Sequence, residues 1–115
     1  MNTYRGTVQK GIGHAKHLGF STINIPFTGG DITGVHAAKV AIGDTVYQAA
    51  AFVNSDRNIL EAHLLDFSGE DLLGKEAVIN LEKKLRDAVV FGDDVEAKEI
   101  IARDVDMVRE FYKLG

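Results

Sequence analysis

The stretch "VHAAKVAIGDTVYQAAAFV", residues 35–53, decides the fold. Small and apolar side chains alternate with others over residues 35–42, which predicts a strand with Lys39 outward. Gly43-Asp44 is a two-residue hairpin signal, and a second strand is expected over residues 45–53. We expect an antiparallel hairpin whose first strand turns three side chains inward: Ala38, Val40 and Ile42.

Strand patterns extend outward from this hairpin in both directions. Residues 3–9 and 59–67 are interpreted as strands, and residues 76–86 as a strand for which the lysines and glutamates leave a helix as an alternative. Residues 10–19 form a glycine-containing loop, and the segment after Pro26 is a turn region. The alternation over 59–67 separates Leu60, Ala62 and Leu64 from Glu61, His63 and Leu65.

The C-terminal segment changes from strand to helix periodicity. Asp93 is placed to cap a helix, with Glu96 three residues later as in a capping box. One apolar stripe then recurs at steps of three and four residues: Ala97, Ile101, Val105, Val108 and Tyr112. About five or six strands followed by one amphipathic helix predict a small antiparallel barrel or sandwich plugged by that helix.

Length and composition exclude several classes of protein. The 115 residues fit one domain, residues 1–115, and the chain has no cysteine for disulfide or thiolate chemistry. The net charge of -4, without a basic stripe, argues against binding long nucleic acids. We find no apolar run of about 20 residues and no signal-peptide pattern, and no partner protein is indicated. We therefore expect a cytoplasmic protein without a membrane partner.

A loop rich in glycine precedes a cluster of hydroxyl and amide side chains. Backbone at Gly11 and Gly13 can turn N–H groups toward an anion, and cationic or titratable side chains lie nearby, at His14, Lys16 and His17. Thr22 offers an oxygen suited to Mg²⁺. The pattern is not a Walker loop. An ordinary hairpin loop, followed by Thr22 and Asn24 in a turn, explains the same residues.

Glu61 and His63 are the second candidate pair. Strands seldom carry a carboxylate amid apolar residues unless that face is polar or paired, and Glu61 could accept a substrate proton. The alternative is that both side chains face solvent from an edge strand, with His63 as a structural partner. The four histidines of the chain lack the spacing of a zinc site.

Taken in order, these segments resemble the riboflavin kinase family. The bacterial pattern "GxGRGRxLGFPTANI" is matched by "GIGHAKHLGFSTINI" at residues 11–25, and "EVHLLDF" by "EAHLLDF" at 61–67. "DLYG" is matched by "DLLG" at 71–74, and "LRxExxF" in part by "LRDAVVF" at 85–91. The final "IxxD" occurs at residues 101–104, so the resemblance covers almost the whole chain.

The resemblance implies a six-stranded antiparallel Greek-key barrel with a C-terminal helix that transfers phosphate from ATP to riboflavin, giving FMN, with Mg²⁺. It implies Glu61 as the catalytic base and Thr22 with Asn24 as ligands of Mg²⁺ and phosphate. The other implied phosphate-binding residues lie in the glycine loop: Gly11, Gly13, His14 and Lys16. Arg86 and Phe91 would border the flavin. No adenylyltransferase segment is present in the chain, so FAD synthesis is not expected.

The chain departs from the family pattern around its ligands. Ser21 replaces a proline, His14 and Ala15 replace arginine and glycine, and "NSDRN" replaces a longer loop before Glu61. Leu73 and Ala88 replace a tyrosine and a glutamate. Three functions therefore stay open: an active kinase, a non-catalytic flavin- or nucleotide-binding module, and a structural barrel whose glycines only form turns.

Overall fold

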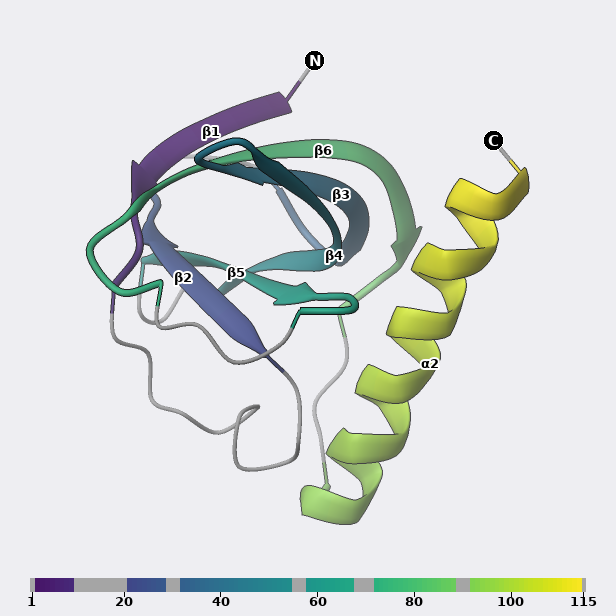
Figure 1. Cartoon of the computed structure of the whole chain (residues 1–115). Helices are drawn as coiled ribbons and strands as arrows, with labels where there is room; N and C mark the ends of the chain where they lie inside the picture. The colour runs from purple at the N-terminus through teal and green to yellow at the C-terminus, as the bar shows by residue number, and fades with distance from the viewer. Residues whose placement is uncertain are drawn as a thin grey trace.

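The computed structural model describes residues 2–9, 21–28, 32–54, 58–67, 72–88 and 92–114. Six antiparallel strands form one sheet in the order β1-β6-β3-β4-β5-β2, and a long helix lies against its outer surface (Figure 1). The elements are β1 (Asn2–Thr7), β2 (Thr22–Pro26), β3 (Val35–Ile42), β4 (Thr45–Asn54), β5 (Ile59–Leu64), β6 (Glu76–Arg86) and α2 (Asp94–Leu114).

The strand order is that of a Greek key. β3, β4 and β5 pair in succession, and β6 returns to lie beside β3, the first of the three. The sheet curls until its two outer strands, β1 and β2, come together (Figure 1). Just beyond β1, the amide of Gln9 donates a 2.7 Å hydrogen bond to the carbonyl of Asn24 in β2. The predicted fold class, a small six-stranded barrel with a C-terminal helix, is confirmed, but the helix lies against the outer face of the sheet and does not plug the barrel.

Gly6 lets the two outer strands approach each other. An ideal Cβ placed on Gly6 would lie 3.0 Å from the Cβ of Ile25 in β2, closer than side-chain carbons normally pack. Ile25 is fully buried in the barrel interior. A side chain at position 6 would therefore push β1 away from β2.

The predicted central hairpin is confirmed. Its last pair is Ile42 with Thr45, and Gly43 adopts a φ of 61°, in the left-handed region that a hairpin turn requires. The predicted inward side chains belong to the barrel core, and Lys39 is exposed. The core contains buried branched side chains from four strands, among them Ile23, Ile25, Val40, Leu60 and Ile79.

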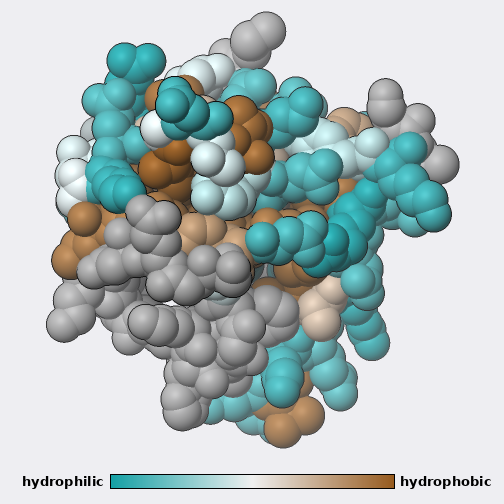
Figure 2. All heavy atoms as spheres, in the orientation of Figure 1, coloured by the Kyte–Doolittle hydropathy of each residue, from teal (hydrophilic) through white to brown (hydrophobic). Residues whose placement is uncertain are grey.

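A second apolar cluster lies outside the barrel, beneath α2. Val35 and Ala37 of β3 and Ala50 of β4 pack with Val108 of the helix. These strand residues point away from the barrel core, and the two alanines are small enough to let the helix backbone approach. Hydrophilic side chains cover much of the side of the molecule on which α2 lies (Figure 2).

The helix begins and packs as its sequence predicts. The side chain of Asp93 accepts a 2.8 Å hydrogen bond from the amide of Glu96, which confirms the N-cap. Ala97, Ile101 and Val108 are buried, and the other two residues of the predicted stripe, Val105 and Tyr112, are half-buried. The expected apolar stripe is therefore the face that docks on the sheet.

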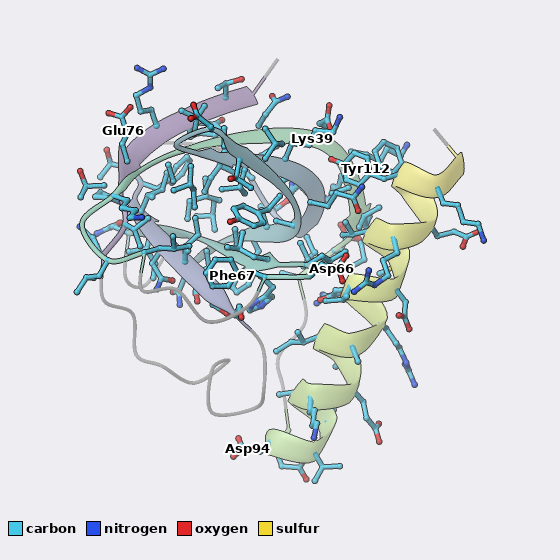
Figure 3. All side chains as sticks on the ribbon, in the orientation of Figure 1. Lys39, Asp66, Phe67, Glu76, Asp94 and Tyr112 are labelled. Atoms are coloured by element: carbon cyan, nitrogen blue, oxygen red, sulfur yellow. The ribbon has the colours of Figure 1, made fainter. Side chains whose placement is uncertain are left out.

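Polar contacts fix the helix at two further points. Arg109 donates two hydrogen bonds, of 2.9 and 2.8 Å, to the carboxylate of Asp66. Near the C-terminal end, the Tyr112 hydroxyl donates to Glu82, and the Lys39 ammonium lies 5.3 Å from the centre of the Tyr112 ring (Figure 3). Within the described residues, no helix is both long and apolar enough to span a bilayer.

Several predicted boundaries are wrong. The strand expected at 59–67 ends at Leu64, because Asp66 has a φ of 56° and turns the chain toward α2. Residues 76–86 form a strand, so the helical alternative is wrong. The strand expected at 3–9 spans residues 2–7, and Thr22 and Asn24 lie in a strand rather than in a turn.

Candidate functional site

Four polar side chains from two neighbouring strands form the centre of the candidate site. In the β2–β5 ladder Thr22 lies opposite His63, and Asn24 lies opposite Glu61. Residues paired in this way share one face of a sheet, and residues two apart on a strand share it too. The intervening residues Ile23 and Ala62 lie in the barrel core. The four, called here the polar quartet, therefore lie together on the outer face.

The quartet brings the predicted metal ligands close to the predicted base. Cross-strand neighbours lie about 5 Å apart, and diagonal neighbours about 7–8 Å apart. Asn24 is thus a direct neighbour of Glu61, and Thr22 a diagonal one. A phosphate group and a cation held by Thr22 and Asn24 would lie within reach of the Glu61 carboxylate.

Hydrogen bonds orient two members of the quartet. The Thr22 hydroxyl Oγ1 lies 2.8 Å from Nδ1 of His63. The side-chain amide of Asn54, the last residue of β4, donates a 3.2 Å hydrogen bond to Oε2 of Glu61. This hydrogen bond restrains the orientation of the Glu61 carboxylate.

His63 is a buried, neutral imidazole. Its side chain is only 3% exposed, and its ring lies 5.3 Å from the Phe52 ring, centre to centre. Desolvation lowers the pKa of His63 to about 4, so the ring is uncharged near neutral pH. The solvent-facing alternative is wrong for this residue, because β5 lies between β4 and β2 rather than at an edge.

Both ends of the glycine-containing segment leave the barrel beside the quartet. The amide of Gln9 bonds to the carbonyl of Asn24, and the carbonyl of Ser21 accepts a 2.8 Å hydrogen bond from the amide of Leu64. The predicted phosphate-binding residues between these two anchors lie outside the described residues: Gly11, Gly13, His14 and Lys16. Their attachment points are nevertheless fixed next to Thr22 and Asn24.

Glu61 and Asn24 also belong to a row of side chains that crosses five strands. Successive cross-strand partners are Arg86, Val35, Phe52, Glu61 and Asn24. This set is called here the outer row. Val35 is buried under α2, whereas Phe52 and Glu61 keep partial exposure. The row therefore passes from beneath the helix at Arg86 to the polar quartet at Asn24.

Arg86 is tied to the helix by a buried ion pair. Its Nε and Nη2 donate hydrogen bonds of 2.6 and 2.8 Å to the two oxygens of Asp104, whose side chain is 3% exposed. The hydrogen bond to Asp104 raises the pKa of Arg86, so the guanidinium stays charged. Arg86 thus joins the end of β6 to α2, at the opposite end of the outer row from Asn24. Phe91, predicted to border the flavin, lies outside the described residues.

The donor atoms of the quartet fit magnesium better than zinc. Thr22 and Asn24 offer a hydroxyl and an amide oxygen, and Mg²⁺ prefers oxygen ligands shared with substrate phosphates and water. Among the residues that the structure describes, no three His, Cys, Asp or Glu side chains gather into a metal site.

The sequence patterns do not indicate two contacts of the candidate site. Asn54 begins the polar segment "NSDRN", yet it is the last residue of β4, and its side chain donates a hydrogen bond to Glu61. Asp104 lies in the "IxxD" pattern, and it pairs with Arg86, 18 residues away. An aspartate within the apolar stripe of an amphipathic helix was the available signal, since buried carboxylates need a partner.

One surface hollow lies away from the quartet. A cavity of about 450 Å³ is lined by residues of the β3–β4 turn and the start of β6: Ala41, Ile42, Gly43, Lys75, Glu76 and Val78. Ile42 is at the opposite end of β3 from Val35, the residue of that strand in the outer row. The hollow is therefore not part of the candidate site.

Comparison with known proteins agrees with this geometry. The riboflavin kinase family model, Flavokinase, matches residues 2–112. The chain is 33% identical over 118 aligned residues to the bifunctional riboflavin kinase/FMN adenylyltransferase of Escherichia coli (strain K12) and, equally, to that of Shigella flexneri. The match covers 95% of this chain and 37% of each relative, so the chain spans little more than a third of their length.

A solved structure has the same fold. The crystal structure described as a macrolide-efflux protein from Streptococcus pneumoniae superposes with a TM-score of 0.79 at 21% identity. The superposition covers 93% of this chain and 38% of that one, and it bears on the fold alone. Since the family model extends over nearly the whole sequence, the chain belongs to the riboflavin kinase family.

Proposed function

We propose that the chain is a riboflavin kinase, which transfers the γ-phosphoryl group of ATP to the 5′-hydroxyl of riboflavin and releases FMN and ADP. The observation that carries this proposal is the polar quartet. Thr22 and Asn24, two oxygen donors suited to a magnesium–phosphate centre, share one face with the carboxylate of Glu61. Membership of the riboflavin kinase family supports the same reaction.

Glu61 is the proton acceptor in this proposal. The 5′-oxygen of riboflavin attacks the γ-phosphorus, the bond from that phosphorus to the β,γ-bridging oxygen breaks, and the hydroxyl proton passes to Glu61. Phosphoryl transfer depends mainly on in-line positioning, so a weak base suffices. The hydrogen bond from Asn54 to Oε2 restrains the carboxylate.

Thr22 and Asn24 bind the phosphates of the nucleotide and their metal ion in this proposal. Their side-chain oxygens would ligate Mg²⁺ or contact phosphate oxygens, and the ion, when bound, would neutralise charge on the transferring group. The two described residues that flank residues 10–20 are fixed beside this pair: Gln9 bonds to the carbonyl of Asn24, and Ser21 directly precedes Thr22. Backbone N–H groups at Gly11 and Gly13, with the side chains of His14 and Lys16, are proposed to contact the phosphates.

The flavin ring is proposed to lie beside Glu61, on the part of the outer row that α2 leaves uncovered. Phe52, the cross-strand partner of Glu61, keeps partial exposure and offers an aromatic surface there. Phe91 is proposed to add a second aromatic surface.

The proposal is tested by incubating the protein with riboflavin, ATP and Mg²⁺ and separating the products by chromatography. We expect FMN and ADP in equal amounts. Glu61→Gln should lower turnover by roughly 10²–10⁴-fold while riboflavin still binds, because the amide cannot accept the proton. Glu76→Gln is the matched control, since Glu76 is exposed on β6 and should leave turnover unchanged.

A chain that binds riboflavin tightly but forms no FMN would instead be a non-catalytic flavin-binding module. The replacements at His14, Ala15 and Ser21 within the family pattern are the observation that favours this alternative. Thermal unfolding with and without riboflavin distinguishes it from a purely structural barrel, because only a binder is stabilised by the ligand.

A further inference from the structure

We propose that His63 is a positioning residue for the magnesium–phosphate centre: its Nδ1 accepts the hydroxyl proton of Thr22 and so turns Oγ1 into an acceptor for a divalent cation. This inference rests on the proposed function. It starts from the 2.8 Å contact between Oγ1 and Nδ1, which joins cross-strand partners on the face that carries Glu61 and Asn24.

The number of protons on the two groups decides which one donates the hydrogen bond. A hydroxyl has one proton and two lone pairs, whereas a neutral imidazole has one N–H and one acceptor nitrogen. If Thr22 donates its only proton to Nδ1, Oγ1 can act toward any further group only as an acceptor. That is the state a cation ligand requires, since a proton aimed at Mg²⁺ would be repelled.

The surroundings of His63 hold its ring in one orientation. His63 is only 3% exposed. On β4, fully buried Ala50 lies directly opposite His63, and the Phe52 ring is tilted against the imidazole at 44°. A ring held on these sides keeps Nδ1 aimed at Thr22.

His63 lies between the second apolar cluster and the rest of the quartet. Its side chain is on the outer face of the barrel, and its cross-strand partners are Ala50 on β4 and Thr22 on β2. Groups that orient metal ligands commonly contribute 10- to 100-fold to metal affinity. We therefore expect His63 to affect the magnesium-dependent part of nucleotide binding.

The test measures ADP binding to the whole chain by calorimetry, once with excess Mg²⁺ and once with EDTA. His63→Leu removes the acceptor at similar volume and should weaken binding about tenfold with Mg²⁺ but not with EDTA. His63→Asn, which can place its amide oxygen near the position of Nδ1, should recover most of this loss. Equal weakening in both buffers would overturn the proposal, because general damage to the fold does not depend on the metal.

A double-variant cycle checks that His63 acts through Thr22. Thr22→Val removes the hydroxyl at nearly constant shape, so adding His63→Leu to it should cause no further loss of Mg²⁺–ADP affinity. Independent, additive losses would overturn the proposal. If the wild-type chain binds ADP no better with Mg²⁺ than with EDTA, the proposed nucleotide site itself is wrong.

A spectroscopic measurement on the wild-type chain does not depend on whether the variants fold. The nitrogen chemical shifts of His63 report which ring nitrogen carries the proton. We expect an unprotonated Nδ1 and a protonated Nε2. A protonated Nδ1 would reverse the direction of the hydrogen bond and overturn the proposal.

Discussion

Removing Arg86 should destabilise the protein strongly, because it leaves the Asp104 carboxylate buried without its cation. In Arg86→Met, the two hydrogen bonds of 2.6 and 2.8 Å disappear while the Asp104 side chain remains 3% exposed. Two unit charges about 4 Å apart attract by about 4 kcal/mol at an effective dielectric constant of 20. Breaking one side of such a pair typically costs about 3–5 kcal/mol. We expect a loss in this range.

Urea unfolding followed by far-ultraviolet circular dichroism measures the loss, and a double variant separates its cause. Arg86→Met with Asp104→Leu removes both charges, so its free energy of unfolding should recover by at least about 2 kcal/mol relative to Arg86→Met alone. A loss below about 1 kcal/mol in Arg86→Met would refute the reasoning. So would a double variant that is as unstable as the sum of the single changes.

Two further predictions concern a backbone position and a buried titration. Gly34 has a φ of 78°, and an ideal Cβ there would lie 2.2 Å from the carbonyl oxygen of Arg86, so Gly34→Ala should cost at least about 2 kcal/mol in thermal unfolding. Gly43→Ala, with a φ of 61° and open space, should cost only about 1 kcal/mol, and equal losses would contradict the clash. Because the pKa of His63 falls from 6.5 to about 4 on folding, the unfolded chain binds more protons between these values. The free energy of unfolding should therefore fall by about 2 kcal/mol from pH 7 to pH 5, and urea titrations should show a smaller fall in His63→Leu.

The parts of the fold that local patterns determine were predictable. The central hairpin follows from alternating side chains and the turn at Gly43, and the helix follows from Asp93 and its apolar stripe. The end of β5 was not predictable, because "LLDF" continues an apolar run and only the left-handed conformation of Asp66 stops it. In this conformation Asp66 also pairs with Arg109 on α2, a contact between residues 43 apart that no local pattern shows.

The sequence indicated which residues belong to the candidate site, but it did not indicate which of them contact one another. Family resemblance pointed to Thr22, Asn24 and Glu61, and their cross-strand register brings them together. The contact between Thr22 and His63 joins residues 41 apart in the chain, so the local sequence around either residue does not predict it. It exists because the sheet curls and pairs β2 with β5, an outcome of packing the whole barrel.

The place where the two outer strands of the sheet meet and close the barrel lies within the candidate site. Asn24, the proposed ligand of phosphate and metal, also accepts the backbone hydrogen bond from Gln9 that joins the two outer strands. A ligand that binds the Asn24 side chain more tightly in the joined arrangement than in an opened one would stabilise the closed barrel. Part of its binding free energy would then add to the stability of the fold, so that the proposed ligand site and the closure of the barrel would share one residue.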